Sequence, residues 1–147
     1  MMNYPLMEGT LTLPDTIRDR TVNMFTLGDS LPAPLSITIS RDDLLPDEDF
    51  DAYIKRQIKL LSSNLKGYHL KNREEVVLGS DDKGIVGVQL NAHYMNKQQP
   101  IYQRQAAFLI SPKRAMIFTT TSQTKLSEQQ NQDWHAMLKG FVSTASA

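Results

Sequence analysis

Apolar residues recur every three or four positions in two segments of the chain, and this spacing predicts two amphipathic helices. The first segment is preceded by the acidic run Asp47–Asp49, which suits the positive end of a helix dipole. The second opens with Ser127 and Gln130, the spacing of a capping box. The apolar positions are Phe50, Ile54, Ile58, Leu61 and Leu65 in the first segment and Trp134, Met137, Leu138, Phe141 and Val142 in the second.

Alternation of apolar and polar residues, which is typical of β-strands, marks seven further segments. They are Thr10–Leu13, Thr21–Leu27, Leu35–Ser40, Tyr68–Leu78, Ile85–Tyr94, Ile101–Ile110 and Ala115–Ser122. Tyr68–Leu78 is charged in its middle, which favours a place near a sheet edge. No strand–helix–strand rhythm suggests a parallel sheet. We therefore predict an α+β fold in which residues 1–147 form a single domain, a single curved antiparallel β-sheet with the two amphipathic helices packed on one face.

The 16 basic and 16 acidic residues of the chain cancel, so there is no excess charge to attract nucleic acid or an anionic membrane. The sequence has no cysteine, which excludes disulfides, thiolate metal sites, a cysteine nucleophile and a lipoprotein anchor. No apolar run approaches the roughly 20 residues that span a bilayer. The segment Met1–Pro5 lacks the features of a signal peptide. We expect a cytoplasmic protein without direct membrane insertion.

Sequence motifs for catalysis or metal binding are absent. None of His69, His93 and His135 has a partner at the spacing of a zinc motif. There is no Gly-x-Ser-x-Gly elbow, Ser-x-x-Lys pair or glycine-rich phosphate loop. The acidic run Asp47–Asp49 is explained by the helix start that follows it. We therefore predict that the protein is not an enzyme and has no metal, no cofactor and no nucleic-acid partner.

Hydroxyl and amide side chains, with one imidazole, occupy strand positions where an exposed sheet face would ordinarily carry charged residues. The positions are Ser36, Thr38, Ser40, Gln89, Asn91, His93, Gln103 and Gln105. Such side chains let a partner backbone approach closely and can hydrogen-bond a helix whose own side chains are apolar. Gln57, at the edge of the first apolar stripe, either faces the same partner or closes the rim of the core. An ordinary solvated strand face is the alternative, and it stays open.

Four segments of the chain resemble the Eag chaperones of bacterial type VI secretion. They are Leu11–Phe25, Ser36–Asp42, Phe50–Gln57 and Arg104–Phe108, and their order and spacing are more specific together than singly. The resemblance implies a DcrB-like protein with a Mog1/PsbP-like fold that forms a cytoplasmic homodimer. It also implies a chaperone that binds the N-terminal region of a PAAR- or Rhs-type effector, shields its transmembrane helices and promotes its loading onto the VgrG spike.

The resemblance further implies a partner-binding surface. Carried over position by position, its residues in this sequence are Val22, Met24, Ser36, Thr38, Ser40, Gln57, Leu65 and Gln105. Thr38 is more polar than the aliphatic residue that the family pattern leads us to expect there. Two other functions stay open: an immunity or adaptor protein that binds a folded partner, and a small enzyme or lipid-binding domain that uses the concave sheet as a pocket.

Overall fold

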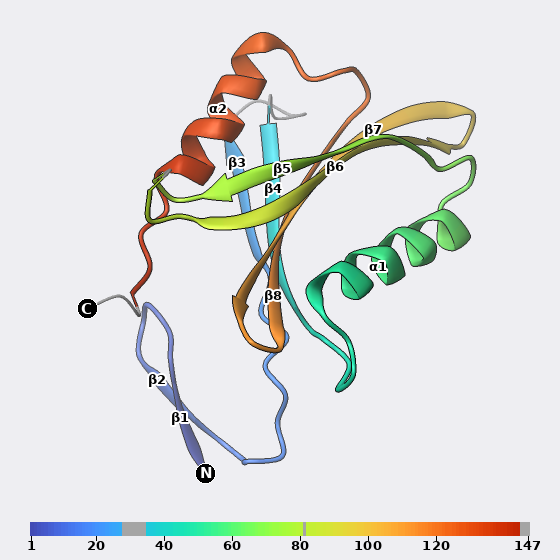
Figure 1. Cartoon of the computed structure of the whole chain (residues 1–147). Helices are drawn as coiled ribbons and strands as arrows, with labels where there is room; N and C mark the ends of the chain where they lie inside the picture. Colours follow the sequence, from blue (N-terminus) through green and yellow to red (C-terminus); the bar gives the residue numbers. More distant parts are fainter. Residues whose placement is uncertain (28–34, 81, 145–147) are drawn as a thin grey trace.

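The computed structural model describes residues 1–27, 35–80 and 82–144, which form eight strands and two helices (Figure 1). In chain order the elements are β1 (Met2–Pro5), β2 (Thr10–Leu13), β3 (Asn23–Leu27), β4 (Leu35–Asp43), α1 (Phe50–Asn64), β5 (His69–Leu78), β6 (Ile85–Asn96), β7 (Gln99–Ser111), β8 (Arg114–Ser122) and α2 (Glu128–Lys139). The α+β prediction, both helices and all seven predicted strands are confirmed, with small shifts at their ends. The pattern missed β1, because four residues that end in a proline are too few to reveal alternation.

Six of the strands form one antiparallel sheet in the order β3-β4-β8-β7-β6-β5. β5 is therefore an edge strand, as its charged middle predicted. β2 does not join this sheet, because it pairs with β1 in a separate two-stranded sheet that Figure 1 shows away from the other strands. That residues 1–147 form a single domain stays a prediction, since residues 28–34, 81 and 145–147 lie outside the described part of the chain.

The two helices pack on opposite faces of the six-stranded sheet, so the prediction that both cover one face is wrong. Neighbouring residues of a strand point to opposite faces, and Ala106 and Ala107 of β7 belong to different apolar clusters. Ala106 packs in the cluster of Trp134 from α2, whereas Ala107 packs in the cluster of Ile54 from α1. In Figure 1, β5, β6 and β7 pass between the helices. We call the two sides of the sheet the α1 face and the α2 face.

Both helices begin at the residues that their sequences indicate. Asp49 is the N-cap of α1, and its side chain accepts a hydrogen bond from the backbone nitrogen of Ala52 at 2.8 Å. Ser127 and Gln130 form the predicted capping box of α2, with each side chain bonded to the other's backbone nitrogen. Local sequence therefore sets where each helix starts, and sheet packing sets the face on which it lies.

Candidate partner-binding surface

A row of polar and flexible apolar side chains crosses four neighbouring strands on the α1 face. Met24 in β3 pairs with Thr38 in β4, and Thr38 pairs with Thr119 in β8. Thr119 pairs in turn with Gln105 in β7, whose Nε2 donates a hydrogen bond to the Thr119 Oγ1 at 3.3 Å. The structure thus brings Met24, Thr38 and Gln105 into one line. It adds Thr119, which the sequence analysis missed because its place between Thr38 and Gln105 depends on strand register.

Ser36 and Ser40 lie on the same face as Thr38, two residues before and after it along β4. All three are partly exposed, and Met24 is 71% exposed. We call this set the open platform; its members are Met24, Ser36, Thr38, Ser40, Gln105 and Thr119. It contains hydroxyls, one amide and one thioether but no charged group, so a partner could bury it without leaving an unpaired charge.

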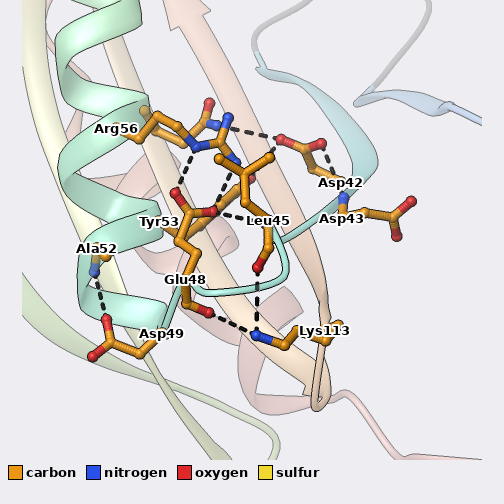
Figure 2. Close-up of polar contacts among 10 residues, drawn as sticks. Asp42, Asp43, Leu45, Glu48, Asp49, Ala52, Tyr53, Arg56 and Lys113 are labelled. Atoms are coloured by element: carbon orange, nitrogen blue, oxygen red, sulfur yellow. Dashed lines mark hydrogen bonds and ion pairs between the residues drawn. The ribbon is translucent and has the colours of Figure 1, made fainter.

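α1 covers the other half of the α1 face and is held there by hydrogen bonds to the end of β4. The hydroxyl of Tyr53 donates to Oδ2 of Asp42 at 3.0 Å (Figure 2), and Nε2 of Gln57 donates to the same oxygen at 3.3 Å. Burial, together with the charge of Asp42, raises the pKa of the Tyr53 hydroxyl, which therefore keeps its proton and remains a donor. These bonds set the position of α1 along the margin of the open platform.

A second group of contacts fixes the loop that leads into α1 (Figure 2). Arg56 donates from Nε and Nη2 to the two carboxylate oxygens of Glu48, at 2.6 and 2.8 Å. These hydrogen bonds hold the pKa of Glu48 below its usual range. Lys113, in the β7–β8 turn, donates to the backbone oxygens of Leu45, Pro46 and Glu48 at 2.9–3.4 Å. The start of α1 is therefore tied to the sheet.

Of the remaining predicted residues, Gln57 borders the open platform, whereas Leu65 lies at the end of α1 and Val22 lies just before β3. Gln57 lines a cavity of about 170 Å³ between α1 and the sheet, together with Ser40 and Gln105. Leu65 is the C-cap of α1, eight residues and about 12 Å of helix axis beyond Gln57. Val22 precedes β3 and is exposed.

Gln89, Asn91 and His93 point to the other side of the sheet, so their expected place beside Ser36 and Thr38 is wrong. Gln89 is buried on the α2 face, where its Oε1 accepts a hydrogen bond from Nε1 of Trp134 at 2.9 Å. Alternation separates the two faces within one strand. It does not tell which of the two groups of side chains in one strand shares a face with which group in the next strand, because that depends on the register of their pairing.

An apolar groove on the α2 face is a second surface that the sequence analysis missed. It lies between β3, β4 and α2, has a volume of about 580 Å³, and includes Phe25, Leu27, Met137 and Phe141 in its lining. Phe25 is 55% exposed although it is a large aromatic residue. The signal for it was present in the sequence, since Phe25 and Leu27 alternate with Met24 along β3.

Within residues 1–27, 35–80 and 82–144, no three His, Asp or Glu side chains gather as metal ligands would. In the same part of the chain, neither helix combines the length and the apolar character needed to cross a bilayer. The expectations that the protein uses no metal and no cofactor stay predictions.

Comparisons with known proteins identify similar chains over most of this sequence. Residues 8–140 match the DcrB family. A Pseudomonas aeruginosa protein named Effector EagT6 is 30% identical over 125 residues, which are 84% of this chain and 83% of that protein. The crystal structure of PA94, a protein of unknown function and putative regulator from Pseudomonas aeruginosa, superposes with a TM-score of 0.78 and 27% identity. That superposition covers 97% of this chain and 96% of PA94.

Proposed function

Because this chain belongs to the DcrB family, as an Eag-like member of it, we propose that it is a type VI secretion chaperone that binds an effector. Its client is the N-terminal region of a PAAR- or Rhs-type effector, whose transmembrane helices it shields in the cytoplasm before the effector is loaded onto the VgrG spike. The observation that carries this proposal is the uncharged row of Met24, Thr38, Thr119 and Gln105 across four strands.

The chemistry of the open platform supports a helix as its partner. Small hydroxyl side chains such as Ser36 and Ser40 let a helix backbone come close, and Thr38 and Gln105 can hydrogen-bond its polar atoms. Met24 supplies a flexible apolar contact that adapts to different side chains. Most of the affinity comes from apolar burial on the client, at about 25 cal/mol per Å² before ordering costs. This function requires no catalytic group.

We further propose that the chaperone is a homodimer, because one sheet face covers only one side of a helix. Two copies related by a twofold axis would present two open platforms and enclose the client between them. Light scattering of the client-free protein should give about twice the chain mass of 16.6 kDa. A single-chain mass at micromolar concentration would contradict this arrangement.

The test is client capture by the variant Thr38→Glu, which places a charge at the centre of the open platform. The free energy of unfolding of the variant should lie within about 1 kcal/mol of the wild-type value, because Thr38 is partly exposed in the free protein. Client affinity should fall by about 100-fold or more, because the new carboxylate would be buried unpaired against apolar helices. The measurement is co-purification with effector N-terminal regions, alongside thermal melts.

The matched control is Thr10→Glu, the same substitution at an exposed strand position in β2, which should retain the client. A third variant, Phe25→Glu, tests the apolar groove on the α2 face. If Thr38→Glu keeps the client while Phe25→Glu loses it, the client binds in that groove and the open platform is only a solvated surface.

A further inference from the structure

A pocket on the α2 face, near the β6–β7 turn, concentrates positive charge in a chain that is neutral overall. It has a volume of about 820 Å³, and its described lining comes from β5 to β8, from α2 and from the segment that enters α2. The basic side chains of this lining are His69, Lys71, His93, Arg104 and Lys125, whereas Glu74 is its one carboxylate. We call it the basic pocket. It is separate from the open platform, which lies on the opposite face.

Arg104 is the most enclosed cation of the basic pocket, and neutral groups hold it. Its Nε donates to Oδ1 of Asn91 at 2.7 Å and its Nη1 donates to Oδ1 of Asn131 at 2.6 Å. The guanidinium carbon lies 5.9 Å from the centre of the Trp134 ring. In the described part of the chain, no carboxylate forms an ion pair with Arg104.

Burial lowers the pKa of the Arg104 guanidinium, and the charge of Glu74 opposes this only in part. Arginine nevertheless keeps its proton in proteins. A partly buried cation without a paired anion is unfavourable, and an anion that enters the pocket would relieve this. Glu74 itself accepts hydrogen bonds from Gln89 and Asn91 instead.

Thr120 provides an independent sign that the basic pocket receives a polar group. It is only 3% exposed, lines the basic pocket and pairs with Arg104 across β7 and β8. Its Oγ1 is buried and has no hydrogen-bond partner among the described residues. A buried hydroxyl without a partner is uncommon in a folded protein and calls for an acceptor. The oxygen of a bound anion would accept a hydrogen bond from it.

We propose that the basic pocket binds a small ligand through a carboxylate or phosphate group, with Arg104 and Thr120 as its innermost contacts and Lys71 and Lys125 at its rim. The rings of His69 and His93 lie 5.1 Å apart, and those of His93 and Tyr102 lie 6.2 Å apart. These rings form a wall along which the remainder of the ligand lies. The volume is in the usual range for small-molecule sites. The proposal does not depend on the chaperone function.

The test is calorimetric titration of the full chain with sodium phosphate and, separately, with sodium citrate, at an ionic strength held constant with sodium chloride. Saturable binding of at least one of them is expected. Citrate alone would identify a carboxylate ligand, phosphate alone a phosphate ligand, and both an oxyanion site that accepts either. If neither anion gives saturable binding at millimolar concentration, the proposal is wrong.

Three variants inside the basic pocket locate the site, and two control variants outside it test that the effect is confined to the pocket. Arg104→Gln and Thr120→Val should weaken anion binding by about tenfold or more, because each removes an innermost donor. Lys125→Gln, at an exposed rim position, should weaken it by a smaller factor and does not threaten folding. Lys59→Gln on the exposed side of α1 and Thr38→Glu on the open platform should leave it unchanged.

Thr120→Val keeps the shape of the side chain, so it remains informative if Arg104→Gln fails to fold. Without anion it should melt at or above the wild-type temperature, because it removes a buried hydroxyl that no described residue hydrogen-bonds. If Thr120→Val and Lys125→Gln both bind the anions as tightly as wild type, the ligand lies elsewhere and the proposal is overturned.

Discussion

The two halves of the α1 face share one sheet and one pattern of alternation, yet their side chains differ. In the half beneath α1, Leu90 and Ala107 are buried against Ile54, which is 1% exposed. In the open half, which runs from β3 through β4 and β8 to β7, equivalent positions carry Met24, Thr38 and Thr119, none of which is buried. The chain itself covers the first half with a helix and leaves the second half uncovered.

This difference indicates what each half is suited to do. The covered half is apolar because its partner helix is always present, and its burial contributes to folding. The open half avoids charged side chains that would resist burial, and it avoids a continuous apolar surface that would aggregate. Hydroxyls and amides satisfy both conditions, because they hydrogen-bond water when free and a partner when bound. We infer that α1 and a client helix occupy comparable positions on neighbouring parts of one sheet.

The largest effect on folding is expected in the covered half. Ile54→Ala should lower the free energy of unfolding by about 2–5 kcal/mol, because it leaves a cavity beneath α1. Leu60→Ala is the matched control, since Leu60 lies on the exposed side of the same helix and should cost less than about 1 kcal/mol. Denaturant unfolding measures both. Equal costs for the two variants would mean that α1 does not seal this half of the face.

The reverse result is expected in the open half. Met24→Ala should change the free energy of unfolding by less than about 0.5 kcal/mol, because Met24 is mostly exposed in the free protein. Client affinity should fall by about tenfold, because an apolar side chain that the client buries is lost. Met7→Ala is the control, a fully exposed methionine between β1 and β2. If binding titrations give the two methionine variants the same client affinity, Met24 is not part of the client-binding surface.

The smallest effect concerns the contacts that position α1, and it depends on pH. Because Arg56 lowers the pKa of Glu48 in the folded protein, their contact stabilises the fold at neutral pH. This stabilisation is lost as the pH falls below the usual pKa of a glutamate and then through the lower pKa that Glu48 has in the folded protein. Glu48→Gln should therefore be less stable at neutral pH and show a shallower loss of stability in acid. Denaturant unfolding across this pH range measures the effect. If the free energy of unfolding of the variant falls with pH as steeply as that of wild type, the contact between Arg56 and Glu48 makes no such contribution.

Local sequence was sufficient for every helix and strand except β1, and for part of the surface. Helix periodicity and the Ser127–Gln130 capping box predicted α2, and alternation placed Ser36, Thr38 and Ser40 on one side of β4. These features involve residues a few positions apart, whose relative directions the backbone geometry dictates. Alternation also singled out Gln105, and the resemblance to the Eag chaperones supplied Met24 and grouped it with Gln105, a residue far away in the sequence that periodicity alone would not have joined to it.

Only the tertiary structure decided how these pieces face one another. Strand register placed Thr119 between Thr38 and Gln105, sent Gln89 to the opposite face, and brought Arg104 beside the buried Thr120. Long-range packing sent α1 and α2 to opposite faces, although their sequences have similar amphipathic patterns. A period of two residues defines the two sides of each strand but not which side meets which neighbour. That choice depends on the summed packing of distant residues, which no local pattern contains.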